Sequence, residues 1–123
     1  AFLDADDVWL PGKLAAQIAE IRNGATFVTT GYHFETKRTK MYPPACIRSP
    51  KDIFLKRGIG TSTVIVSRKL LRNLRFKDIR FSQDIDFWFQ LSQQKNFNYA
   101  AIKRTFVCYN TQGSTRNKLK QLI

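Results

Sequence analysis

The start of the chain most constrains its fold, because an apolar run ends there in a cluster of carboxylates and a helical pattern follows. The run reaches Leu3, then come Asp4, Asp6 and Asp7, and Pro11 opens the helical pattern. This order predicts a buried strand, a turn and a helix. Carboxylates at positions i and i+2 beyond a strand can converge on one hard cation such as Mg²⁺ or Mn²⁺, which keeps coordination positions open for substrate phosphates. Asp4 and Asp6 are therefore candidate metal ligands.

Helix capping is the competing interpretation of these acids. Acidic residues before a helix accept hydrogen bonds from its free N–H groups and favour the positive end of its dipole. One acid is enough for a cap, so we assign Asp7 to that role. The chain begins inside a strand pattern and without an initiator methionine. We therefore expect it to be the later part of a longer protein.

Turn residues and apolar periodicity predict the other elements. Helices are expected at residues 11–23, 50–57, 68–73, 83–94 and 117–123. Strands are expected at residues 25–34, 61–66 and 105–109, with a hairpin or irregular excursion at 35–48. Leu14, Ile18 and Ile21 share one face of the first helix, and Ser49 is the expected N-cap of the second. No repeat or low-complexity linker interrupts this alternation, which predicts a single α/β or α+β domain over residues 1–123.

The net charge of +12 is the second unusual property of the chain. Between Lys37 and Arg80, thirteen Lys or Arg residues stand against Asp52 and Asp78 alone. Such a surface attracts anionic lipid, nucleic acid or phosphate-bearing substrates, and a merely solvated face is the alternative. Nucleic-acid binding ranks last among these, because the sequence has no zinc finger, RNP-like strand or basic region with heptads.

Cysteine usage and apolar runs bear on the compartment. Cys46 and Cys108 lie far apart without a CxxC pattern, and the chain has one histidine, so we expect reduced thiols in the cytoplasm and not a zinc site. No apolar run approaches the roughly 20 residues that span a bilayer. The cysteine usage predicts a cytoplasmic protein, and the basic surface adds a peripheral position at the inner face of the membrane as an option.

A second candidate site lies at the start of helix 83–94, for which Ser82 is the expected N-cap. Asp84 falls in the first turn of this helix, and Phe87 and Trp88 supply an apolar anchor. A carboxylate on a rigid helix start is well placed to accept a proton from a substrate hydroxyl, which is the first requirement of a general base. A structural role is the competing interpretation, because an acid favours the positive end of the helix dipole.

The opening pattern Phe-Leu-Asp-Ala-Asp-Asp-Val-Trp-Leu-Pro-x-Lys-Leu, with Gln17 following, resembles the D-x-D segment of family-2 glycosyltransferases. The apolar, acidic, aromatic, proline and basic positions all match in order. The resemblance implies a nucleotide-diphospho-sugar transferase fold of the GT-A type, which is an α/β fold. It also implies that Asp4 and Asp6 hold Mn²⁺ or Mg²⁺ on the diphosphate of a nucleotide-sugar donor.

The helix at 83–94 is similar to the family's catalytic-base segment. Asp84 matches the base, and Phe87 and Trp88 match aromatic positions; Gln83 stands where the family has Glu, which removes one charge beside the base. Two further stretches resemble the family, at residues 60–68 and 107–118. In the second, Asn110 and Gln112 replace the usual Arg and His, while Arg116 and Lys118 keep positive charge near the end.

The family's upstream motifs, Ile-Pro-x-Tyr-Asn and Asp-Asp-Gly-Ser, are absent from this sequence. We therefore predict the C-terminal part of a catalytic domain, a partial GT-A fold without its N-terminal nucleotide-binding strands. The implied function is sugar transfer from a nucleotide-diphosphate sugar to a saccharide or lipid-linked acceptor by a metal-assisted inverting displacement. The alternative is a non-catalytic basic binding or assembly module at an anionic membrane surface. A sheet edge exposed by the missing strands predicts a homodimer.

Overall fold

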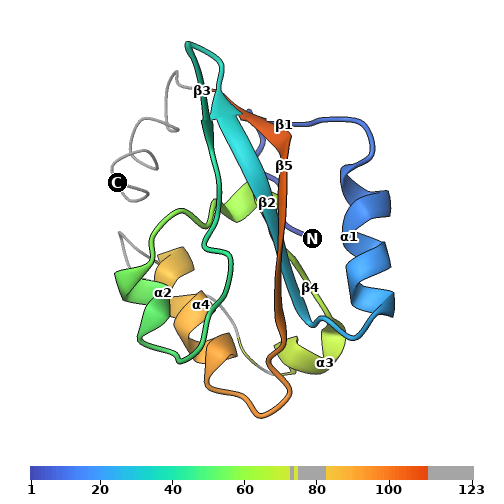
Figure 1. Cartoon of the computed structure of the whole chain (residues 1–123), viewed down its shortest axis with the longest axis vertical. Helices are drawn as coiled ribbons and strands as arrows, with labels where there is room; N and C mark the ends of the chain where they lie inside the picture. Colours follow the sequence, from blue (N-terminus) through green and yellow to red (C-terminus); the bar gives the residue numbers. More distant parts are fainter. Residues whose placement is uncertain (73, 75–82, 111–123) are drawn as a thin grey trace.

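An open, mixed sheet forms the centre of the molecule (Figure 1). The computed structural model describes residues 1–72, 74 and 83–110. The strands are β1 (Val8–Trp9), β2 (Phe27–Phe34), β3 (Lys37–Met41), β4 (Ile65–Val66) and β5 (Tyr99–Tyr109). Their order is β1-β5-β2-β3, and β4 pairs with β2 beside this path. Only β2 and β5 pair in parallel among the described strands. A mixed, open sheet with helices packed on it fits the predicted α/β class.

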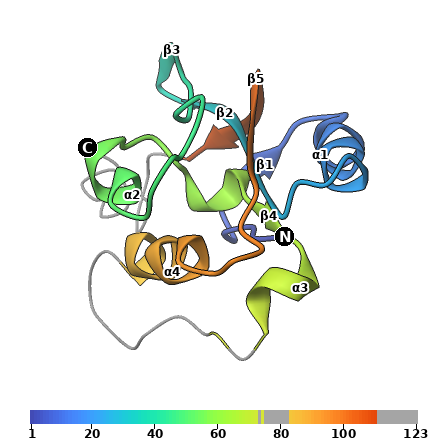
Figure 2. The ribbon, with the colours of Figure 1, turned by 60° about the horizontal axis from the view of Figure 1, so that its bottom comes forward.

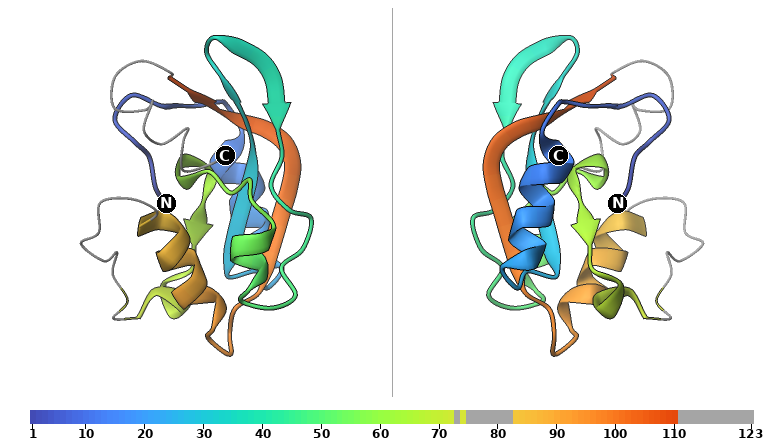
Figure 3. Two further views of the ribbon diagram at one scale, coloured as in Figure 1. Left: turned by 90° about the vertical axis from the view of Figure 1, so that its left-hand side faces the viewer. Right: turned by 90° about the vertical axis from the view of Figure 1, so that its right-hand side faces the viewer.

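Helices lie on both faces of this sheet. They are α1 (Lys13–Arg22), α2 (Asp52–Leu55), α3 (Arg68–Leu71), α4 (Gln83–Ser92) and the 3-10 turn η1 (Thr61–Thr63). Figure 3 shows α1 against one face, and α2 and α4 against the other. Figure 2 shows α4 beneath the sheet with α2 at its side. Within the described residues, no helix combines the length and apolar character needed to cross a bilayer.

The main core lies between α4 and the sheet. Trp88 of α4 is 1% exposed, and its ring meets Phe27 of β2 edge-on, with 5.3 Å between the ring centroids. Phe87 and Leu91 join it from the same helix, as the apolar anchor predicted for Asp84 requires. A smaller cluster of Tyr32, Val107 and Tyr109 fills the other end of the paired β2 and β5 strands, next to Trp9. These two clusters fix the positions of the acidic opening and of α4.

The predicted strand at 61–66 is largely wrong. Only Ile65 and Val66 form a strand, and residues 61–63 form the turn η1. The reason is local: the Thr63 hydroxyl donates to the Gly60 carbonyl at 2.6 Å. Threonine and serine hydroxyls that bind nearby backbone groups compete with strand pairing in this way. β5, in contrast, begins six residues earlier than the predicted 105, because it pairs in parallel with β2 from Phe27 onward.

The predicted strand ending at Leu3 is also absent. Residues 1–3 belong to no strand, and Leu3 is 52% exposed. Phe2 instead packs edge-on against Trp88, with ring centroids 5.5 Å apart. The acidic cluster therefore follows an extended segment that packs on the core, and the first strand pairing comes after it, at Val8 and Trp9.

Helix α1 differs from its prediction in its buried face. It begins at Lys13, after Gly12 in the left-handed region at φ 89°. Leu14 and Ile18 are each 40% exposed, whereas Lys13 and Gln17 are buried. The apolar periodicity predicts the wrong buried face, because the buried hydrogen bonds of Gln17 turn its side of the helix toward the core.

The structure agrees with several of the remaining predictions. The predicted hairpin is present at the start of region 35–48, because β3 pairs antiparallel with β2. Helices 68–73 and 83–94 correspond to α3 and α4 within two residues at each end. Helix 50–57 shortens to α2, without a side-chain cap from Ser49. The Ser82 cap, helix 117–123 and the tail residues Gln112, Arg116 and Lys118 lie outside the described residues. The homodimer stays a prediction, although Lys37 and Lys40 on edge strand β3 oppose pairing with another chain.

Candidate active site

The turn η1 connects the two predicted sites. Thr61 Oγ1 donates to Asp84 Oδ2 at 3.1 Å, and Ser62 Oγ donates to Asp7 Oδ2 at 2.7 Å. The third hydroxyl, of Thr63, lies 2.6 Å from the Thr29 hydroxyl on β2. Three successive residues thus hold the acidic opening, α4 and the central strand in one arrangement. Sequence reasoning missed this turn; its one signal is the run of three hydroxyl residues directly after Gly60.

Asp4 and Asp7 converge on the Ser62 hydroxyl. Asp4 donates its backbone N–H to Ser62 Oγ at 3.1 Å, and its Oδ2 atom lies 3.4 Å from the same oxygen. Asp6, half-buried, sits between them in the turn that precedes β1. The structure thus brings Asp4 and Asp7 together at Ser62 of η1, with Asp6 in the adjoining turn, and the metal site stays a prediction.

Asp7 is not a helix cap, which corrects its predicted role. Helix α1 starts six residues later and has no side-chain cap. Asp7 is 6% exposed, and its Oδ1 atom accepts the Asn110 N–H at 3.4 Å. Burial raises the pKa of Asp7 to about 6; the charges of Asp4 and Asp6 raise it further, while the hydrogen bonds from Ser62 and Asn110 act in the opposite direction. A cap would sit at the solvated helix end, whereas Asp7 belongs to the buried base of the acidic cluster.

Asp84, the predicted general base, lies at the start of α4 and is held by two hydrogen bonds. Its carboxylate is on the first turn of α4 and is 7% exposed. Besides the bond from Thr61, its Oδ1 atom accepts the N–H of Ile85 at 2.9 Å. These two hydrogen bonds fix the orientation of the carboxylate, and a fixed orientation is the first requirement for proton transfer. Asp84 therefore joins the acidic opening through two adjacent residues, Thr61 and Ser62.

The donor chemistry of Asp4 and Asp6 fits a hard divalent cation. Carboxylate oxygens are the ligands that Mg²⁺ and Mn²⁺ prefer. Among the described residues, however, no group of three or more His, Cys, Asp or Glu side chains is arranged to hold a metal ion by itself. One or two carboxylates together with substrate phosphates is the usual arrangement for Mg²⁺. The residues present fit a metal that reaches the site with a diphosphate.

Ser62 is held from two further directions. Its carbonyl accepts the indole N–H of Trp9 at 2.9 Å, and its N–H donates to the Tyr109 hydroxyl oxygen at 3.1 Å. Burial raises the pKa of Tyr109, so this phenol stays protonated. Gly60 lies against the Tyr109 ring, where an added Cβ would approach two ring carbons to 3.1 Å. Glycine is therefore required for η1 to lie this close to β5.

Gln17 of α1 binds the turn η1 directly, and Lys13 binds Gln17. Gln17 Nε2 donates to the carbonyls of Val28 at 3.0 Å and Thr63 at 2.7 Å, which links α1 to both β2 and η1. Lys13 Nζ donates to Gln17 Oε1 at 2.7 Å and lies 4.1 Å from the centre of the Trp9 ring. Burial lowers the pKa of Lys13 to about 8. Both residues belong to the opening motif, but their spacing alone did not indicate this supporting role.

Comparison with known proteins finds a similarity to a bacterial enzyme. No family model matches the chain. The sequence is 33% identical over 130 aligned residues to UDP-Glc:alpha-D-GlcNAc-diphosphoundecaprenol beta-1,3-glucosyltransferase WfgD of Escherichia coli. The alignment covers 99% of this chain and 50% of that enzyme, so the chain spans about half the length of the curated relative it matches. Nearly the whole chain, including both acidic sites, is therefore similar to part of a bacterial glycosyltransferase.

Proposed function

We propose that this chain is the C-terminal part of the catalytic domain of an inverting sugar transferase with a partial GT-A fold. The whole protein would transfer a sugar from a nucleotide-diphosphate donor to a hydroxyl group of a lipid-linked acceptor. One observation carries the proposal: η1 holds the Asp84 carboxylate through Thr61 and the acidic opening through Ser62. The likeness to an enzyme also favours sugar transfer over the non-catalytic binding module.

In the proposed reaction, Asp84 accepts the proton of the acceptor hydroxyl. That oxygen attacks the anomeric carbon of the donor sugar, and the bond from this carbon to the diphosphate breaks on the opposite face, which inverts the configuration. Thr61 orients the base through its 3.1 Å hydrogen bond. A divalent metal bound by Asp4 and Asp6 would offset the charge on the departing diphosphate. Gln83, exposed beside the base, leaves Asp84 without the adjacent negative charge that the family pattern has.

The relative's name indicates which substrates to test first. It describes glucose transfer from UDP-glucose to a GlcNAc unit on diphosphoundecaprenol. We propose a donor and acceptor of the same chemical kinds here, and a peripheral position at the membrane that contains such an acceptor. The cationic character of the chain fits anionic substrates of this type, because it raises the local concentration of diphosphates.

The test is an Asp84→Asn variant of the protein that carries this chain, assayed with UDP-glucose and GlcNAc-diphosphoundecaprenol. Loss of a general base lowers kcat by about 10²–10⁴-fold. Asp86→Asn is the matched control, because Asp86 lies on the same helix and is bound by the Gln90 side-chain amide at 2.7 Å. Its rate should equal that of the wild type. Equal losses in both variants, or wild-type turnover by Asp84→Asn, would contradict the assignment of the base.

A further inference from the structure

The short helix α2 presents an apolar pair to solvent. Leu55 is 72% exposed, which is the highest value among the large apolar side chains of the described residues, and the adjacent Phe54 is 49% exposed. Phe54 packs one side of its ring on Phe89 of α4, with 5.0 Å between the ring centroids. The pair therefore projects from a helix that is itself packed on the core.

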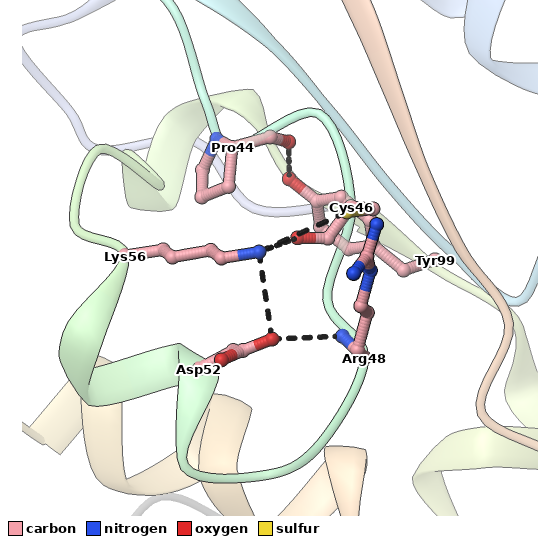
Figure 4. Close-up of polar contacts among 6 residues, drawn as sticks. All are labelled: Pro44, Cys46, Arg48, Asp52, Lys56 and Tyr99. Atoms are coloured by element: carbon pink, nitrogen blue, oxygen red, sulfur yellow. Dashed lines mark hydrogen bonds and ion pairs between the residues drawn. The ribbon is translucent and has the colours of Figure 1, made fainter.

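Cations flank this pair in the sequence, and the described segment 36–72 has no exposed acid beside them. Arg48, Lys51 and Arg57 are exposed, and Lys56 is half-buried. Asp52 is the one acid between residues 36 and 72, and its side chain is buried. Its Oδ2 atom accepts the Arg48 N–H at 2.9 Å and lies 3.6 Å from Lys56 Nζ (Figure 4). We call the exposed surface of Arg48, Lys51, Phe54, Leu55 and Arg57 the α2 corner.

The α2 corner stands on a fixed support. The Tyr99 hydroxyl of β5 donates to the Pro44 carbonyl, at 2.6 Å, and Lys56 Nζ lies 3.4 Å from the Cys46 carbonyl (Figure 4). These contacts tie the segment before α2 to the sheet and to α2 itself. The backbone that carries the apolar pair and Arg48 is thus held in place before any partner arrives, which lowers the entropic cost of ordering it on binding.

We propose that the α2 corner docks the protein on an anionic phospholipid bilayer. Leu55 and Phe54 enter the boundary between headgroups and acyl chains, while Arg48, Lys51 and Arg57 lie among the lipid phosphates. Apolar burial and attraction between cations and anionic lipid both favour this position, and membrane-surface segments combine these two features. A bilayer suits the corner better than a second copy of the chain, because like-charged corners repel and a four-residue helix is small against a standard protein interface.

The inference deepens the proposed function, since docking at a bilayer would bring the base and the metal-binding acids to a lipid-linked acceptor. Its test does not depend on sugar transfer. The wild-type protein is mixed with vesicles of phosphatidylcholine alone, or of phosphatidylcholine with phosphatidylglycerol, and floated on a density gradient. Binding is expected on the anionic vesicles and should weaken as salt is raised.

Two variants remove the two parts of the corner. Leu55→Ser should lower the vesicle partition coefficient about tenfold, and Lys51→Glu should lower it by a similar factor. Leu14→Ser and Arg22→Glu are matched controls on α1, which covers the other face of the sheet, and should bind like the wild type. Leu55→Trp should show a blue-shifted emission that brominated lipids quench. Circular dichroism checks that each variant is folded.

Two outcomes of the vesicle assay would overturn the proposal. Unchanged vesicle binding by Leu55→Ser and Lys51→Glu, or equal losses in the α1 controls, would show that the α2 corner is not the docking site. A dimer that Leu55→Ser dissociates, or nucleic-acid binding that both corner variants lose while vesicle binding is absent, would assign the corner to those partners instead. Asp84→Asn should lose sugar transfer and keep wild-type vesicle binding, so the two proposals can fail separately.

Discussion

Replacement of Asp7 by asparagine should stabilise the protein at neutral and alkaline pH. Asp7 is 6% exposed, and burial raises its pKa from 3.8 to about 6. The folded state therefore binds more protons than the unfolded state between these values, so the free energy of unfolding falls as the pH rises from about 4 to about 6. A difference of about two pKa units corresponds to at most about 3 kcal/mol. Asp7→Asn removes the buried charge and should recover part of that amount at pH 8, because the amide keeps one of the two acceptor oxygens that Ser62 and Asn110 use.

The assay is urea unfolding of wild type and variants at pH values from 4 to 8. The wild-type free energy of unfolding should decline across this range relative to that of Asp7→Asn, and the two should agree best near pH 4. Asp7→Ala separates charge from hydrogen bonding, because it leaves the Ser62 hydroxyl and the Asn110 N–H without their acceptor. It should be less stable than Asp7→Asn at every pH. Parallel pH profiles for wild type and Asp7→Asn would refute the reasoning.

Three further predictions concern the surroundings of η1. Gly60→Ala should lower the free energy of unfolding by about 1–3 kcal/mol, measured by thermal melting, because the new methyl group meets the Tyr109 ring. Lys13→Met should raise stability at pH 7 and remove the increase that we expect in the wild type as the pH rises from 8 to 10.5, since burial lowers the pKa of Lys13. Mn²⁺ with UDP should raise the Tm of the wild type, and Asp6→Ala should abolish that shift; a shift retained by Asp6→Ala would exclude Asp6 as a ligand.

The elements predicted well are those whose local pattern and tertiary environment agree. Helix α4 has its acids in the first turn and its aromatic residues on the buried face, so amphipathicity alone locates it. Strand β2 is rich in β-branched and aromatic residues and lies at the sheet centre. The first half of β5 was missed, because pairing with β2, and not its own composition, makes residues 99–104 a strand.

The candidate site likewise has residues that the local sequence indicates and residues that only the tertiary fold identifies. Asp4, Asp6 and Asp84 could be proposed from the sequence because clustered carboxylates after an apolar run, or a carboxylate at a helix start, have few chemical roles. Thr61 and Ser62 could not, because their role depends on partners 23 and 55 residues away in sequence. Hydroxyl residues are common, and nothing local distinguishes those that join two acidic segments. The sequence thus predicts candidate reactive groups, whereas the residues that connect them emerge only from the fold.

The buried side chains of Lys13 and Asp7 indicate that the surroundings of η1 serve function as well as stability. Both side chains are buried, and burial shifts both pKa values toward the neutral form, which means that each charge destabilises the fold near neutral pH. Lys13 donates to an amide, and Asp7 accepts from a hydroxyl, so neither of these buried hydrogen bonds is an ion pair. A core that served stability alone would place apolar side chains at both positions. Asp7 binds Ser62 of η1, and Lys13 binds Gln17, which binds the same turn. Groups with perturbed pKa values that cluster in this way are typical of functional sites. We therefore expect the double variant Asp7→Asn with Lys13→Met to be more stable than the wild type and, in the protein that carries this chain, to lower the proposed sugar transfer.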